Sequence, residues 1–329
     1  MKENNKFYDD ISPTLSIIIP AYNVEDYITE ALDSIFNQSQ LPDEIIVIND
    51  GSTDNTSDVI KTHPLYKTIN LIEIANKGQG QARNIGVSKA SSDYIYFFDS
   101  DDLLVDNFVQ QVKNEIIENQ HPDLFFFSGE SFEDSRFTGK KSFSNYVRNF
   151  EGYFDNQQDF LEVLLQGPEL SCSPCLYISR RSIWISNELE FNPFYHEDEE
   201  LLYPLIFSAS SYLVSKNIYF LRRIRSNSTM TQSKSEKHEL GLEALLKSLL
   251  VLLDNNKSYN LRVNLIRRRL GAFCLSYLMV SKQVSGNVNY ELLLTATLQS
   301  RNVKTPLAIL KHMVKKNAKK TVFNNKLFK

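Results

Sequence analysis

Short apolar runs alternate with amphipathic segments from about residue 14 to residue 128. The runs are rich in β-branched and aromatic residues and are too short for helices, which predicts buried strands of a sheet covered on both faces. The segments between them repeat apolar residues every three or four positions, which predicts helices that pack by one face. The predicted strands are 15–19, where Pro20 stops the run, 44–48, 69–74, 94–98 and 124–128. The predicted helices are 25–38, 54–61, 80–90 and 107–119.

This alternation predicts an α/β fold with a mostly parallel, doubly wound sheet flanked by helices and joined by right-handed crossovers. Ligands of such sheets bind outside the carboxyl ends of the strands. The polar residues that follow three of these strands should therefore converge on one crevice. They are Tyr22, Asn23, Asp50 and the acidic turn formed by Asp99, Ser100, Asp101 and Asp102.

The pattern changes twice further along the chain. Residues 129–156 are irregular and aromatic, and we expect a long surface excursion or hairpin there. Residues 157–222 return to mixed structure, with a helix over about 199–208. From about Ser233 the apolar periodicity is long and without strand signals, which predicts a helical C-terminal subdomain. Its longest periodic segments are 240–253 and 261–282.

Composition and charge narrow the class of protein. The chain has 329 residues, of which 42% are hydrophobic, so it can bury a full core. Its 36 basic and 40 acidic residues give a net charge of −4, which argues against a general nucleic-acid binder. Cys172, Cys175 and Cys274 are too few for a disulfide framework and indicate a reducing compartment. Cys172-Ser-Pro-Cys175 has the spacing of a redox motif but lacks its strand-then-helix context.

Neither a signal peptide nor a membrane span is evident in the sequence. The first residues are polar, and the longest apolar stretch, 270–280, is about half the length that crosses a bilayer. We therefore expect a cytoplasmic protein.

The C-terminal stretch 301–329 holds nine Lys and Arg residues and no acidic residue, with apolar residues interspersed. One interpretation is attraction to anionic lipid head groups at the inner face of the cell membrane. The other is a solvated basic tail or a helix that binds a partner protein.

The acidic turn carries three carboxylates directly after a buried apolar run. Charge at this position is unfavourable unless a cation or hydrogen bonds compensate it, so the turn is a candidate site for a hard divalent metal. The alternative is a helix N-cap, in which aspartate accepts hydrogen bonds from free backbone N–H groups. These residues alone leave both interpretations open.

Four segments, in this order along the chain, resemble motifs of the family 2 inverting glycosyltransferases of the bacterial surface-polysaccharide type, which have the GT-A fold. They are 18–23, 47–54, 80–86 and 98–102. The resemblance covers roughly residues 14–230. It implies transfer of a sugar from a UDP-sugar to an acceptor hydroxyl on a glycan or a lipid-linked saccharide, in polysaccharide biosynthesis. It also implies a cofactor, Mn²⁺ or Mg²⁺.

We therefore expect a polar leader over residues 1–13 and a nucleotide-sugar-binding and catalytic domain over residues 14–230. The helical subdomain with its basic tail would occupy residues 231–329. The resemblance is specific for the family but not for the sugar, so the enzyme would be a hexosyl- or N-acetylhexosaminyl-transferase.

The resemblance assigns the nucleotide site to residues near the first strand ends. Tyr22, which follows Pro20 and Ala21 in the first motif, would lie against the uracil ring, and Asp50 would accept a hydrogen bond from the uracil N–H. Arg83 would contact the ribose or a phosphate. Without the resemblance, Tyr22 and Asp50 would be interpreted as loop and turn residues.

The resemblance also makes Asp99-Ser100-Asp101 the DXD motif of the family. One carboxylate would contact the ribose, and Asp99 and Ser100 would bind the donor. The metal would lie among Asp99, Asp101 and Asp102. The sequence does not say which of these three aspartates touches the ion.

A second acidic cluster begins at Glu197, about a hundred residues later. By the resemblance Asp198 is the general base and Glu197 contacts substrate, whereas the alternative is an acid-rich helix N-terminus. Many relatives have a metal-binding His where Arg225 stands. Arg225 would instead pair with the diphosphate or belong to a solvated basic turn.

Two other functions are alternatives to sugar transfer. A non-catalytic scaffold of a glycosyltransferase complex would keep the fold, but the intact acidic motifs speak against it. A dinucleotide-binding dehydrogenase is disfavoured because Pro20-Ala21-Tyr22 occupies the turn in which a glycine fingerprint would stand. The sequence does not identify the sugar, the acceptor or the oligomeric state.

Overall fold

The computed structural model describes residues 12–137, 145–168, 170–225 and 233–301, together with 306, 307 and 309. The chain divides into two compact units. The first contains the described residues of Met1–Pro193 and Glu197–Gln232, and the second those of Phe194–His196 and Ser233–Lys329. The predicted polar leader and nearly all of the basic tail lie outside the described residues.

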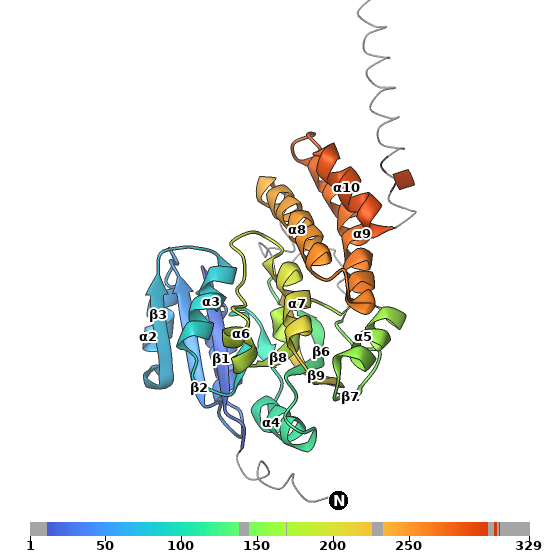
Figure 1. Ribbon diagram of the computed structural model, residues 1–329. Coiled ribbons are helices and arrows are strands. Elements are labelled where there is room, and N and C mark those ends of the chain that lie inside the picture. The colour runs from blue at the N-terminus through green and yellow to red at the C-terminus, as the bar shows by residue number, and fades with distance from the viewer. Residues whose placement is uncertain are drawn as a thin grey trace, which may run out of the picture. The chain divides into compact units, whose positions relative to one another are not determined.

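The first half of the sheet in the first unit is parallel, in the order β3-β2-β1-β4. Figure 1 labels β3, β2 and β1 of this half. Every residue of β1 and β4 is buried, because helices and loops cover both faces of these strands. The bounds are Leu15–Ala21 for β1, Glu44–Asp50 for β2, Ile69–Ile74 for β3 and Tyr94–Phe97 for β4.

The prediction that Pro20 stops the first strand was wrong, because β1 continues to Ala21. Pro20 lies opposite Ile48 of β2, whereas the pairing of β1 with β4 ends at Ile18. Proline lacks an N–H donor, but it is tolerated at a strand end where only one neighbour continues.

The second half of the sheet is mixed, and its order continues from β4 as β8-β6-β9-β5, with β7 beside β9. β8 is antiparallel to both β4 and β6, and β6 is parallel to β9. β9 pairs antiparallel with β5 and with β7. The bounds are Leu103–Leu104 for β5, Leu124–Glu133 for β6, Gly152–Phe154 for β7, Tyr177–Arg180 for β8 and Tyr212–Ile224 for β9.

Helices cover this sheet and carry two of the site segments, α3 and α7. Gly86 of α3 faces Ile18 of β1, and a Cβ at Gly86 would lie 2.2 Å from Ile18 Cγ2. This glycine allows the close approach of α3 to β1. The helices of the first unit are α1 Ile28–Phe36, α2 Thr56–Thr62, α3 Gln79–Lys89, α4 Phe108–Glu118, α5 Gln157–Gln166, α6 Arg181–Ser186 and α7 Glu197–Ser208, with short 3₁₀ helices η1 Tyr66–Thr68 and η2 Pro174–Leu176.

The described residues of the aromatic stretch 129–156 are more ordered than a surface excursion and include an antiparallel pairing, which agrees with the hairpin that was the other expectation. β6 extends through it to Glu133, and Gly129 and Tyr146 exchange backbone hydrogen bonds of 3.1 and 2.8 Å. Arg148 is buried there, donating to Phe127 O at 2.8 Å and to Leu176 O at 3.0 Å. These described residues therefore belong to the sheet and its core.

The second unit is helical over its described residues, with α8 Glu236–Asn255, α9 Asn260–Gln283 and α10 Tyr290–Ser300. Phe194–His196 pack with these helices: the Tyr195 ring contacts His238, and a Cβ at Gly241 would lie 2.4 Å from Tyr195 O. None of the helices among the described residues is both long enough and apolar enough to cross a bilayer.

Candidate active site

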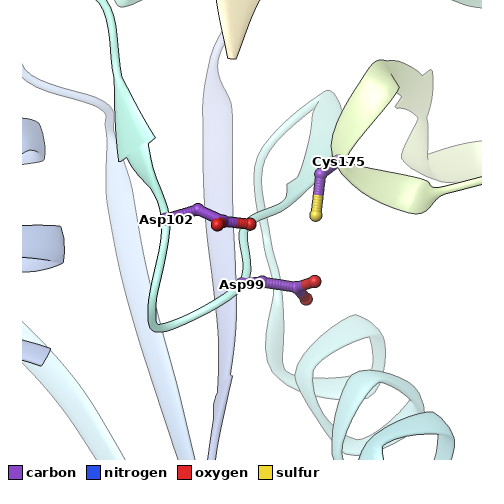
Figure 2. A group of neighbouring side chains, drawn as sticks. All are labelled: Asp99, Asp102 and Cys175. Carbon is purple, nitrogen blue, oxygen red and sulfur yellow. The ribbon is translucent and has the colours of Figure 1, made fainter. Parts of the chain in front are cut away.

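The acidic turn follows β4 at the carboxyl edge of the parallel strands, as predicted. The Asp102 N–H donates to Asp99 O at 3.2 Å and closes the turn. The side chains of Asp99, Asp102 and Cys175 point toward a common space (Figure 2), and one ligand atom of each lies within 4.8 Å of the others. Asp102 is buried, whereas Asp99 is partly exposed. Ser100 is also buried within the turn.

The electrostatics of this cluster favour a cation. Burial, followed by the charges of Asp101 and Asp99, raises the pKa of Asp102 well above its usual range. Burial, followed by the charges of Asp99 and Asp102, likewise raises the pKa of the Cys175 thiol. A divalent cation would reverse both effects, because it stabilises the deprotonated forms of its ligands. Two carboxylates that reach one space fit a hard divalent ion, and the sulfur adds a softer donor.

Two arginines at the end of β9 and just beyond it bind the acidic turn. Arg223 donates its backbone N–H to Asp102 Oδ1 and its Nε to Asp101 O, both at 2.7 Å. Arg225 Nε donates to Asp101 Oδ2 at 2.5 Å. Asp101, one of the predicted metal ligands, is thus paired with Arg225, while Asp99 and Asp102 face the shared space.

Arg83 joins the acidic turn to the second acidic cluster. Its NH2 donates to Asp99 Oδ1 at 3.0 Å and its NH1 donates to Glu197 Oε1 at 3.1 Å. Burial disfavours the charge on Arg83, but the carboxylates of Asp99 and Glu197 outweigh it and raise its pKa. Gln79 also donates to Asp99 Oδ1, at 2.8 Å. Segments about a hundred residues apart therefore meet at one edge of the sheet.

Glu197 and Asp198 open α7. Burial is the main reason that the pKa of Glu197 is raised to about 7. The positive charge of Arg83 opposes this rise, and the negative charge of Asp198 adds to it. Asp198 Oδ1 accepts the backbone N–H of Glu199 at 2.8 Å, and Asp198 Oδ2 accepts the thiol of Cys172 at 3.2 Å. The Asp198 carboxylate is therefore held by one donor on each oxygen.

The remaining predicted site residues lie at the ends of β1 and β2. Pro20 and Ala21 are buried, whereas Tyr22 directly after them is 48% exposed. Asp50 is buried, and its carboxylate accepts the backbone N–H groups of Lys77 at 2.7 Å and Gly78 at 2.8 Å. Each Asp50 oxygen keeps a second lone pair for a further donor.

Several residues that touch these groups were not predicted as site residues. Cys172, Gln79 and Arg223 all contact a predicted site residue, and sequence analysis had judged the Cys172 motif only by its redox spacing. No local pattern marks Cys172 as a partner of Asp198, because the two residues are 26 positions apart and on different segments.

The fold and this arrangement of acidic motifs at strand ends define the GT-A class of glycosyltransferases. A solved structure with this fold, S. aureus TarS 1-349 in complex with UDP-GlcNAc, matches with a TM-score of 0.60 and 19% identity, covering 87% of this chain and 88% of that chain. The chain belongs to glycosyl transferase family 2, whose family model matches residues 16–181. Family and fold are thus as the sequence predicted.

Curated relatives are bacterial proteins named as glycosyltransferases. Glycosyltransferase GlyA of Streptococcus pneumoniae serotype 4 is 32% identical over 157 residues, which is 43% of this chain and 23% of GlyA. A glycosyltransferase of Rickettsia bellii is 37% identical over 138 residues, 42% of this chain and 19% of that protein. EpsH of Bacillus subtilis, also named as a glycosyltransferase, is 28% identical over 254 residues, 75% of this chain and 71% of EpsH. The chain thus spans less than a quarter of the length of the first two relatives.

Proposed function

We propose that the protein is an inverting glycosyltransferase that moves a hexose or N-acetylhexosamine from a UDP-sugar to an acceptor hydroxyl in polysaccharide biosynthesis. The observation that carries this proposal is the bridge made by Arg83. Its guanidinium binds Asp99 of the acidic turn and Glu197 beside Asp198. A donor diphosphate at the turn and a base at Asp198 would then meet around one sugar.

The donor would bind along the strand ends. Tyr22, exposed after Pro20 and Ala21, would stack on the uracil ring, and Asp50 would accept its N–H. Asp99 and Ser100 would contact the ribose, and Glu197 the sugar. Arg83 and Arg225 would supply positive charge beside the diphosphate.

The acidic turn would hold the divalent cation, Mn²⁺ or Mg²⁺, through Asp99 and Asp102. Asp101 would join them if the diphosphate drew Arg225 away from it, and the Cys175 thiol faces the same space. The cation, when bound, neutralises charge that develops on the departing diphosphate. TarS, which shares the fold, was solved with UDP-GlcNAc and with UDP, which supports a UDP-sugar as donor.

Asp198 would act as the general base of a single displacement. As the acceptor oxygen attacks the anomeric carbon, Asp198 takes the hydroxyl proton and UDP departs, so the configuration at that carbon inverts. The Asp198 carboxylate is ready for this role because its two oxygens are oriented by Glu199 N–H and the Cys172 thiol.

Replacing Asp198 by Asn tests this function. Asp198→Asn should lower turnover at least a hundredfold, because the base is lost, and should leave UDP affinity nearly unchanged. UDP release with Mn²⁺ is measured with UDP-glucose, UDP-galactose, UDP-GlcNAc and UDP-GalNAc, using water as the acceptor, and UDP affinity by calorimetry.

The matched control is Glu200→Gln, which removes a carboxylate from the same helix turn and should keep wild-type turnover. Full turnover in Asp198→Asn would exclude Asp198 as the base. No UDP release by the wild-type protein from any of the four donors would favour the non-catalytic scaffold.

The acceptor would be a glycan or a lipid-linked saccharide at the inner face of the cell membrane. The basic stretch 301–329, with nine cations and no anion, supports attraction to an anionic lipid surface. The partners we propose are thus a UDP-sugar, a saccharide acceptor and peripheral contact with the membrane, without nucleic acid.

A further inference from the structure

The three cysteines differ in their surroundings. Cys175 and Cys274 are buried, whereas Cys172 is only partly buried and its sulfur lies 3.2 Å from Asp198 Oδ2. The thiol is the donor in this contact, because a carboxylate oxygen can only accept. Cys172, which is partly exposed, therefore contacts the Asp198 carboxylate. In the proposed function this carboxylate takes the proton of the acceptor hydroxyl.

The segment that carries Cys172 is held in place independently of α7. Arg148 NH2 donates to Leu176 O at 3.0 Å and Arg148 Nε to Phe127 O at 2.8 Å, which ties the segment to β6. The Tyr96 hydroxyl donates to Cys175 O at 3.1 Å, which ties it to β4. The backbone three and four residues after Cys172 is thus tied to β4 and β6, and the Cys172 thiol reaches Asp198 from this anchored segment.

We propose that Cys172 is a positioning residue that orients the Asp198 carboxylate for proton transfer. This inference rests on the proposed function, in which Asp198 is the base. With Glu199 N–H on Oδ1 and the thiol on Oδ2, rotation of the carboxylate is restricted and each oxygen keeps a free lone pair. A thiol is a weak donor, so it orients the base and takes little of its basicity.

The proton balance of the step is simple. The proton of the acceptor hydroxyl passes to Asp198 as the glycosidic bond forms, and Cys172 keeps its own proton throughout. Cys172 forms no covalent bond with the substrate, and no oxidant is required.

The first test separates hydrogen bonding from packing. Cys172→Ala removes the donor and should lower the kcat of Mn²⁺-dependent UDP release roughly five- to tenfold, with the KM for the UDP-sugar unchanged. Cys172→Ser supplies a hydroxyl donor and should restore most of kcat. Ser173→Ala is the matched control, because the Ser173 hydroxyl makes no hydrogen bond to any residue that the structure describes. Wild-type kcat in Cys172→Ala, or equal losses in the Ala and Ser variants, would overturn the inference.

The second test detects the contact without turnover. The thiol of Cys172 donates to the Asp198 carboxylate, so Asp198→Asn, which removes this charged acceptor, should make Cys172 react several-fold faster with iodoacetamide at neutral pH. Tyr146, Arg148 and Tyr177, which also interact electrostatically with Cys172, are unchanged in the variant. Cys172→Ala gives the background from Cys175 and Cys274. An unchanged rate of Cys172 alkylation would show that the contact is absent.

The two tests distinguish failure of this inference from failure of the proposed function. If Asp198→Asn retains turnover, Asp198 is not the base and the proposed function falls, although alkylation still reports the contact. If Asp198→Asn is inactive while Cys172→Ala is fully active, the function stands and the positioning role is wrong.

Discussion

Asp134, a buried aspartate just beyond β6, shows how differently two arginines can bind one carboxylate. Arg223 NH1 donates to Asp134 Oδ2 at 2.9 Å, and the side chains of both residues are 4% exposed. Arg136 Nε also donates to Asp134, at 2.8 Å, but its side chain is 49% exposed. Arg223 in addition binds Glu30 and the acidic turn. The buried arginine therefore fixes the turn, and the exposed one is screened by solvent.

Replacing each of these arginines by methionine separates the two contributions. Arg223→Met should lower the free energy of unfolding by about 2–3 kcal/mol, because it removes the buried guanidinium that binds Asp134, Glu30 and the backbone carbonyl of Asp101. It should also weaken Mn²⁺-dependent UDP binding, because Asp101 loses a restraint. Arg136→Met, the matched control, should cost much less. Urea unfolding and calorimetry measure both effects, and equal losses in the two variants would contradict this account.

Sequence analysis named most residues of the candidate site singly, but few of the contacts between them. Position after a predicted strand placed Tyr22, Asp50 and Asp99 at one edge of the sheet, whereas the family resemblance assigned their roles and that of Asp198. The contact between Arg83 and Glu197 joins residues 114 positions apart, and neither carries a local signal for the other. Such pairings depend on how the strands are ordered, which periodicity does not encode.

The strands show the same difference between what a local sequence pattern can predict and what depends on contacts distant in the sequence. β1, β2 and β4 contain short apolar runs, whose length and β-branched or aromatic composition distinguish them from the amphipathic helices between them. β5 has only two residues, and β9 has partly exposed positions within thirteen residues, so neither forms a recognisable run. In the mixed half of the sheet only β6 was therefore predicted as a strand, although the fold class was predicted.

The contact between α3 and β1 gives a test at the scale of elements. Gly86→Ala would place a Cβ 2.2 Å from Ile18 Cγ2, and this overpacking should cost about 1–3 kcal/mol of unfolding free energy. In the Ile18→Ala background the obstructing methyl group is gone, so Gly86→Ala should cost clearly less. A double-mutant cycle by chemical denaturation measures the coupling between the two positions. Additive losses would show that the helix is not limited by this contact.

At the scale of the whole molecule, the chain combines an acidic site with a basic C-terminal stretch. The chain carries a net charge of −4, yet residues 301–329 contain nine cations and no anion. The charge is thus unevenly distributed along the sequence, which matters for any charged surface that the protein meets. This uneven distribution predicts that residues 301–329 are attracted to an anionic membrane surface, which the net charge of the whole chain does not predict.

Removing residues 302–329 tests the proposed membrane contact. The full chain should bind phosphatidylglycerol-containing vesicles at low salt and lose this binding at high salt, because each lysine contributes about 1 kcal/mol near an anionic surface. The shortened chain should bind weakly at both salt concentrations and keep its Mn²⁺-dependent UDP release. Phosphatidylcholine vesicles are the control in a co-sedimentation assay. Equal binding by both chains would reject the contact.

The grouping of Phe194–His196 with the helical unit has a consequence for recombination between relatives. The chain leaves the first unit at Pro193, contributes three residues to the second and returns at Glu197, one residue before Asp198. Tyr195 packs tightly against Gly241, where no larger residue fits without a shift. A chimera that exchanges residues 233–329 through a single junction would therefore separate Tyr195 from its matched glycine. A successful exchange must therefore replace residues 194–196 together with residues 233–329, because the second unit is built from both segments of the sequence.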